Sequence, residues 1–86
     1  MVQVEFFGIA RRRAGVESVT LDAASLREVC RQLVVQLPAR SEICTDDGRL
    51  KAGFLASVNG RTFVSEPETP LRDGDAVVLL SADAGG

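Results

Sequence analysis

The chain has 86 residues and a formal net charge of −2. This length allows one small domain that buries roughly 60% of its unfolded surface, and the 45% of hydrophobic residues can supply its core. The slightly acidic balance argues against a general nucleic-acid binder. No apolar run approaches the roughly 18 residues of a membrane span.

Met1 leads directly into an alternating segment rather than into a charged and then apolar signal peptide, so we expect a cytoplasmic protein. Histidine is absent, and Cys30 and Cys44 are the only cysteines. Two cysteines alone cannot complete a four-ligand zinc site, and neither Cys-His nor Ser-His catalysis is possible without histidine. We therefore expect no metal site and no autonomous hydrolase activity.

The first strand is predicted for residues 2–7, where apolar and polar side chains alternate. Phe7 falls on the outward face, and it is either shielded by a loop or used as a partner contact. Residues 11–15 then read as a basic turn, with Gly15 providing the reversal. Its three arginines form a solvated bend or, alternatively, a rim for an acidic partner or a phosphate. A second strand over 17–21 completes an antiparallel hairpin.

A helix follows, and Ser25 and Glu28 match the capping box that starts it. Pro38 ends the helix, because the residue before proline avoids helical geometry. Cys30 lies on the apolar face and is expected to be buried, whereas Cys44 lies in a polar loop and could be exposed. The positions that form one continuous apolar face are Leu26, Val29, Cys30, Leu33, Val34 and Leu37.

Residues 39–53 are polar and irregular, with a turn at Asp47-Gly48 and possible short structure around residues 49–51. A strand over 54–58 and a return over 61–64 are joined by Asn59-Gly60, a pair that favours hairpin turns. The register of this turn leaves the direction of Phe63 open. Pro67 and Pro70 exclude a central strand from the following segment.

The last strand is predicted over 76–80, and its apolar character on both faces places it centrally. One helix crossing a mixed sheet of four to five strands buries every apolar face, so the fold class is an α+β roll. The first and last strands can then lie side by side. We expect a domain of residues 1–80 and a tail of residues 81–86 that projects from the middle of the sheet.

The tail ends in Gly85-Gly86. Glycine lacks a Cβ and tolerates unusual backbone angles, so this pair could pass through a narrow slot and present the Gly86 carboxylate to a partner's catalytic centre. A frayed chain end is the alternative explanation.

The whole chain resembles the MoaD/ThiS family of ubiquitin-like β-grasp sulfur carriers, and most of all the molybdopterin synthase small subunit. The resemblance rests on the order and spacing of five features, none specific alone. These are Val4-Glu5-Phe6-Phe7-Gly8, Arg11 with Gly15, Ala56-Ser57-Val58-Asn59-Gly60, the segment from Pro70 to Leu80, and Gly85-Gly86. Arg13 and Asp83 depart from the apolar or uncharged residues common at these places.

This resemblance implies a carrier of sulfur with no permanently bound cofactor. A MoeB/ThiF-like adenylating enzyme would use Mg-ATP to activate Gly86, and a sulfur donor would convert it to a thiocarboxylate. The large subunit of molybdopterin synthase would then use this sulfur to build the dithiolene of the pterin cofactor. The chain would thus be a non-catalytic carrier subunit of a sulfurtransferase, with the active site on the partner.

The resemblance also implies roles for single residues. Gly86 would carry the sulfur and Gly85 would permit passage into the slot. Phe7, Phe63 and Leu80 match the family's docking surface, and Arg11 matches a basic position that would contact the adenylating enzyme. Of these assignments, only that of Phe7 has independent support, because strand alternation places Phe7 on the outward face.

Other hypotheses stay open from the sequence. The sulfur could go to thiamin, to tRNA thiolation or to amino-acid synthesis. Gly86 could instead join the chain to lysines of target proteins as a ubiquitin-like modifier, and Lys51 is the only lysine through which chains of modifiers could form. A non-catalytic binding domain with incidental glycines is the remaining alternative.

Overall fold

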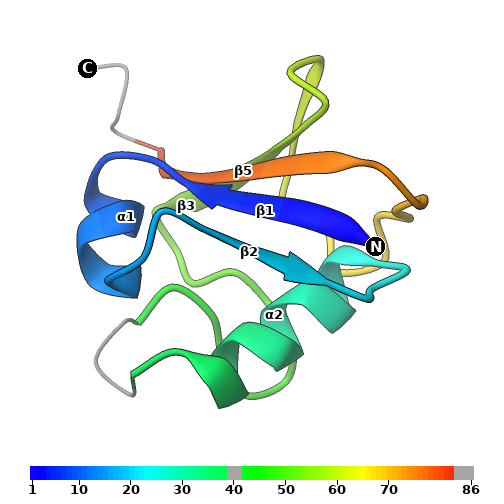
Figure 1. Cartoon of the computed structure of the whole chain (residues 1–86). Coiled ribbons are helices and arrows are strands. Elements are labelled where there is room, and N and C mark those ends of the chain that lie inside the picture. The colour runs from blue at the N-terminus through cyan, green and yellow to red at the C-terminus, as the bar shows by residue number, and fades with distance from the viewer. Residues whose placement is uncertain (39–41, 83–86) are drawn as a thin grey trace.

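The computed structural model describes residues 1–38 and 42–82 (Figure 1). These residues form a five-stranded sheet and two helices. In chain order the elements are β1 (Val2–Phe6), α1 (Ile9–Ala14), β2 (Ser18–Leu21), α2 (Leu26–Gln36), β3 (Phe54–Val58), β4 (Thr62–Val64) and β5 (Ala76–Ser81).

The last strand occupies the centre of the sheet, whose order is β2-β1-β5-β3-β4. β5 runs parallel to β1, with Gln3 opposite Ala76, and antiparallel to β3, with Val58 opposite Val77. The predicted central position and the predicted neighbour relation of the first and last strands are both confirmed. β5 extends through Ser81, one residue beyond the predicted strand.

The core lies between the sheet and α2, which runs below the sheet in Figure 1. Alternation in β1 and β5 directs every second side chain into it, as the sequence predicts. The largest fully buried side chains are Leu26, Leu33, Ile43, Leu79, Val2, Val4, Val29, Val77 and Cys30.

The connection between β1 and β2 differs from the prediction. The three arginines lie in a short helix, α1, and not in a turn. Ala10 and Ala14 are buried one helical turn apart, so the helix packs through its small side chains while the arginines face outward. Gly15 reverses the chain in the left-handed conformation, with φ of 79°, and its N–H donates to Arg11.

Helix α2 begins as the sequence predicts, with Ser25 as its N-cap. The Ser25 hydroxyl accepts a hydrogen bond from the Glu28 N–H at 3.3 Å. The Glu28 carboxylate accepts from the N–H of Ala24, one residue before the position that the capping box specifies. The predicted apolar face is buried from Leu26 to Leu33.

The β3–β4 hairpin turns at Asn59-Gly60, as predicted, with φ of 54° and 68°. The Asn59 side chain also connects this turn to the start of β5. Its amide donates to the Asp75 carboxylate at 2.9 Å and its carbonyl accepts from the Ala76 N–H at 2.8 Å. The other Asp75 oxygen accepts from the Arg72 N–H at 2.9 Å. Asp75 therefore fixes the hairpin relative to the central strand.

The loop over residues 42–53 packs beside α2. Ile43 is fully buried, and Cys44 pairs with Leu50 through a single β-bridge. Cys44 is half-buried against the core, so its predicted exposure in a polar loop is only partly correct. The expected turn at Asp47-Gly48 is present, and Gly48 has a φ of 84°.

Gly48 lies directly against α2. A Cβ at this position would come within 2.5 Å of the Arg27 Cγ and 3.1 Å of the Arg27 carbonyl oxygen. Arg27 cannot readily move away, because its guanidinium donates to Glu68 and to the Asp47 carbonyl at 3.0 Å. The loop is thus held on the helix at a contact that only glycine fits.

We expect Gly48→Ala to destabilise the protein more than Gly74→Ala. At Gly74, with φ of 90° and open space around a Cβ, alanine should lower the free energy of unfolding by about 1–2 kcal/mol because of its backbone conformation alone. At Gly48 overpacking adds about 1–3 kcal/mol. Urea titration of both variants measures the difference. Equal losses of unfolding free energy in the two variants would show that the loop over residues 42–53 accommodates the added Cβ without strain.

We expect the contribution of Asp75 to stability to depend on pH. The hydrogen bond from the Arg72 N–H, followed by that from Asn59, lowers the pKa of Asp75. Because the folded pKa lies below the ordinary value of about 3.9, the carboxylate stabilises the fold above that value. This stabilisation is lost as the pH falls through the folded pKa.

Asp75→Asn should therefore lower the urea midpoint at neutral pH, and its difference from wild type should shrink in strong acid. Asp46→Asn is the matched control, because it removes the same charge from an exposed position. A difference for Asp75→Asn that stays constant across this pH range would contradict the assignment.

Candidate functional site

The end of β5 is held on both sides. Ser81 is buried and lies opposite Phe54 of β3. The Ala82 N–H donates to the Gly53 carbonyl oxygen at 2.6 Å. Gly85 and Gly86, the predicted carrier residues, lie outside the described residues. The point from which the predicted tail leaves the domain is therefore well defined by backbone pairing.

Phe7 lies beside this end of β5. It follows β1 directly, and its N–H donates to the Leu79 carbonyl oxygen at 2.9 Å. Its side chain is 59% exposed, so the loop that could have shielded it does not. An exposed aromatic side chain thus neighbours the strand that leads into the tail.

Leu80 and Phe63 share the sheet face that points away from α2. Leu80 alternates with the buried Leu79, and Phe63 lies opposite Ser57, next to the buried Ala56. Phe63 is 65% exposed and Leu80 is half-buried. The structure resolves the direction that the turn register left open for Phe63, and it places both residues on the outward face.

Two further apolar residues of this face were missed in the sequence. Leu55 lies opposite Leu80 in the pairing of β3 with β5, and Val78 lies opposite Ser57 in the same pair of strands. Both are half-buried. Strand alternation counted from Ala56 and from Val77 would have identified them. We call Phe7, Leu80, Leu55, Val78 and Phe63 the apolar strip.

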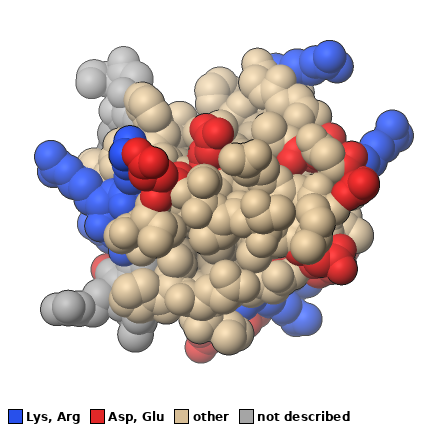
Figure 2. Space-filling model, in the orientation of Figure 1, with Lys and Arg blue, Asp and Glu red and all other residues tan. Residues whose placement is uncertain are grey.

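A basic surface borders the apolar strip at α1. Figure 2 shows Lys and Arg side chains gathered at the left edge of the molecule, where Figure 1 places α1, beside a broad uncharged area. Arg11 forms an ion pair with Glu17. Arg13 lies 3.5 Å from the Glu42 carboxylate and 5.9 Å from the centre of the Phe54 ring. Within residues 1–38 and 42–82, Arg12 has no ion pair, so its charge is available to a partner.

Two shallow hollows lie at the basic surface, and one of them includes Phe7. One, of about 290 Å³, is lined by Phe7, Arg11 and Glu17 together with Glu5, Phe6 and Ser18. The second, of about 560 Å³, shares Arg11 and Glu17 and adds Arg12, Val16, Gly8 and Gly15. Apolar and basic side chains therefore form one continuous surface near the end of β5. Such a surface suits docking to another protein.

The described part of the chain holds no group of three or more potential metal ligands. No helix in it is long and apolar enough to cross a membrane. The candidate site therefore consists of the fixed end of β5, the apolar strip and the basic surface.

The sequence model of the ThiS family matches residues 4–86, which is nearly the whole chain. The chain belongs to the ThiS family. No curated protein sequence matches the chain.

Solved structures similar to this ThiS family chain share its fold. SAMP1 of Haloferax volcanii is 25% identical with a TM-score of 0.77, and the match covers 99% of this chain and 98% of that one. CysO of Mycobacterium tuberculosis is 27% identical with a TM-score of 0.73, covering 95% and 99%. A Pyrococcus furiosus protein, provisionally named molybdopterin converting factor subunit 1, is 25% identical with a TM-score of 0.68, covering 93% and 94%.

These likenesses confirm the predicted β-grasp fold, with a mixed five-stranded sheet and one main helix. They also establish the general class of the ThiS family chain: it is a ThiS/MoaD-like sulfur carrier or small modifier. Carriers of this kind pair with activating enzymes and other partners. One structure with the same fold, 24% identical, is the BexX/CysO complex of Amycolatopsis orientalis.

Proposed function

We propose that this ThiS family chain carries sulfur on the carboxylate of Gly86 as the small subunit of molybdopterin synthase. The observation that carries the proposal is the apolar strip, which runs across the outward sheet face to the root of the tail. A protein that docks on Phe63, Leu80 and Phe7 would receive the tail at the edge of the same interface.

The chemistry of the proposal needs an activating enzyme. A carboxylate is a poor acylating agent, so this enzyme would use Mg-ATP to place AMP on Gly86 and release pyrophosphate. A sulfur donor then displaces AMP and leaves a thiocarboxylate. The sulfur stays nucleophilic and tethered, and Gly85 supplies the small profile that a narrow channel requires.

Each partner would use a different part of the surface. We assign the apolar strip to the large subunit of molybdopterin synthase and Arg11 to the activating enzyme. Arg12 strengthens the second assignment, because it offers an unpaired cation beside Arg11 to an acidic surface. We keep the division into a domain of residues 1–80 and a tail of residues 81–86 as part of the proposal. Ser81, still paired in β5, is the root of this tail.

A second candidate is a protein modifier joined to lysines through Gly86. The likeness to SAMP1, a small archaeal modifier protein in its Methanosarcina acetivorans form, favours it. Both candidates require the same activated Gly86. They differ in the acceptor, which is a docked large subunit for the carrier and a lysine side chain for the modifier.

We expect deletion of Gly86 to abolish activation without changing stability. With a cognate adenylating enzyme, ATP and sulfide, the wild-type protein should gain about 16 Da as sulfur replaces oxygen. The shortened protein and a form with one extra residue after Gly86 should gain nothing, and all three should unfold at the same urea concentration.

If the mass of the wild-type protein stays unchanged with an adenylating enzyme that is proven active, the sulfur-carrier proposal is rejected. Thiol-resistant adducts on lysines that require Gly86 would instead favour the modifier.

We expect Phe63→Ala to weaken binding to the large subunit by about tenfold or more, as at interface hot spots. Its free energy of unfolding should change by no more than about 0.5 kcal/mol, because the side chain is exposed. Val35→Ala is the matched control, since Val35 is 85% exposed on α2, on the other side of the sheet. Calorimetry measures both affinities.

If the Phe63→Ala and Val35→Ala variants bind the large subunit with equal affinity, the apolar strip is not the docking surface. Recovery of a thiazole synthase, rather than a pterin-converting subunit, in a pulldown with the wild-type chain would redirect the proposal to thiamin.

A further inference from the structure

The turn between β3 and β4 carries a reactive pair of residues. Asn59 is the only asparagine of the chain, and Gly60 follows it. In such a pair the glycine nitrogen can attack the asparagine side-chain amide, because no Cβ shields this nitrogen. Both residues are exposed to water. Apart from the chain neighbours, no heavy atom lies within 4 Å of the place that a Gly60 Cβ would take. The attacking nitrogen is therefore accessible.

The side-chain amide of Asn59, in contrast, is restrained against the start of β5. The Asn59 backbone N–H donates to the Ala76 carbonyl oxygen at 2.7 Å, and the side-chain carbonyl accepts from the Ala76 N–H at 2.8 Å. The side-chain nitrogen donates to the Asp75 carboxylate at 2.9 Å. Attack by Gly60 expels this nitrogen, so the bond to Asp75 must break before the reaction is complete.

Asp75 restrains the amide rather than assisting its departure. Its second oxygen accepts from the Arg72 N–H at 2.9 Å, and this bond lowers the pKa of Asp75. The group is therefore ionised at neutral pH and has no proton to give to a departing nitrogen. It acts only as a charged acceptor, and hydrogen bonds to charged groups are among the stronger ones in proteins.

We propose that Asn59 is a deamidation site that the Asp75 carboxylate and the Ala76 N–H keep latent. The reaction proceeds when the turn separates from β5 and the amide is free to meet the Gly60 nitrogen. This modification site lies in the hairpin, and its chemistry is independent of any reaction at Gly86.

The reaction takes place in two balanced steps. In the first, the Gly60 nitrogen attacks Asn59 Cγ, a bond forms between them, and the bond from Cγ to Nδ2 breaks. The Gly60 proton passes through water to the departing nitrogen, which leaves as ammonia, and a cyclic imide remains. In the second, water opens the imide at either carbonyl and gives aspartate or isoaspartate. One water is consumed for each ammonia released, and nothing is oxidised or reduced.

Either product loosens the hairpin. A carboxylate replaces the amide donor and faces the carboxylate of Asp75, so an attraction becomes a repulsion. Isoaspartate also adds a backbone carbon to a two-residue turn whose length sets the strand register. β4 has three residues and pairs with β3 alone. It therefore depends strongly on this turn, and it carries Phe63 of the apolar strip.

The first test compares folded and unfolded wild-type protein. The full chain is incubated in mildly alkaline buffer with and without a denaturing concentration of urea. Chromatography with mass spectrometry of the tryptic peptide 52–61 separates its amide, aspartate and isoaspartate forms. We expect deamidation in the folded protein to be at least about tenfold slower, because the hydrogen bond to the charged acceptor must first be broken. Equal rates in the two conditions would overturn the proposal.

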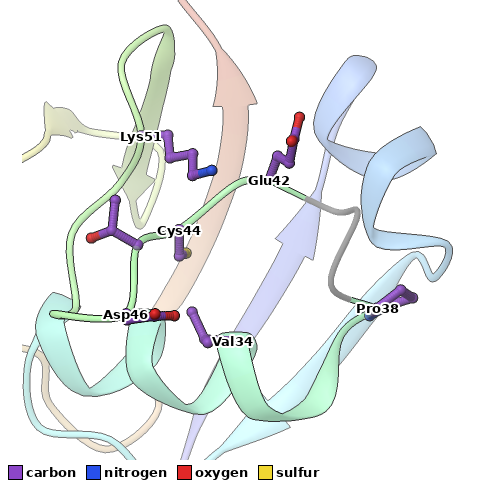
Figure 3. A pocket seen from close by; sticks show the side chains of 7 residues that line it. Val34, Pro38, Glu42, Cys44, Asp46 and Lys51 are labelled. Carbon is purple, nitrogen blue, oxygen red and sulfur yellow. The ribbon is translucent and has the colours of Figure 1, made fainter.

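The second test removes the restraint from the folded protein. Asp75→Ala should speed deamidation by about tenfold, since the amide loses its charged acceptor. Asp46→Ala is the matched control and should keep the wild-type rate. Asp46 is an exposed carboxylate on the loop over residues 42–53, where Figure 3 shows it beside Val34 of α2. A wild-type rate in Asp75→Ala would overturn the proposal.

A third variant separates release of the turn from general unfolding. Gly48→Ala strains the loop on α2 and leaves the hydrogen bonds of Asn59 in place. At a comparable free energy of unfolding it should deamidate more slowly than Asp75→Ala. Equal acceleration in the two variants would overturn the assignment to Asp75. If Asp75→Ala does not fold, the comparison of folded with urea-unfolded wild-type protein decides the outcome.

The effect on docking is tested apart from the chemistry, because it alone rests on the proposed function. Asn59→Asp imitates the aspartate product. It should unfold at a lower urea concentration than wild type and bind the large subunit of molybdopterin synthase more weakly. Wild-type stability would contradict the loosening of the hairpin. Lower stability with unchanged binding would argue against docking at Phe63 and would support the loosening all the same.

Discussion

Parallel pairing of β5 with β1 is the constraint on which the other features of this protein depend. It places the last described strand at the centre of the sheet, with β3 hydrogen-bonded on its other side. Val77 and Leu79 are consequently sealed in the core. The root of the tail is then fixed by two neighbouring strands rather than by one edge. A tail that delivers a reactive group needs such a fixed origin, because the position of its base determines what its end can reach.

The alternation of β5 gives the domain two surfaces with separate tasks. Side chains at odd positions build the core between the sheet and α2, whereas Val78 and Leu80 contribute to the apolar strip. Substitutions on the apolar strip can therefore change partner choice with little effect on folding. This separation is consistent with ThiS/MoaD-like carriers and modifiers sharing one fold at about 25% identity. The core defines the fold, and the outward face is free to differ.

Local signals made most of the fold predictable. Alternation identified β1 and β5, the Ser25 cap and the apolar face identified α2, and Asn59-Gly60 identified a hairpin. Helix α1 was missed because two alanines, small and weakly apolar, carry its packing beneath three arginines. The outward direction of Phe63 depends on turn register, and the half-burial of Cys44 against the core depends on tertiary packing. No local pattern encodes either. The proposed roles of Gly85 and Gly86 rest on the resemblance to the family alone.

The central position of β5 also has a consequence for how the protein is made. Ribosomes release a chain from its amino end, so β1, β2 and α2 emerge before their central partner has been synthesised. Until β5 inserts, β1 and β3 present unpaired edges toward the gap between them. Chains that lack β5 therefore have no strand that joins the β1–β2 pair to the β3–β4 pair. The cell would thus accumulate folded molecules only from chains in which translation has passed the strand that leads to the tail.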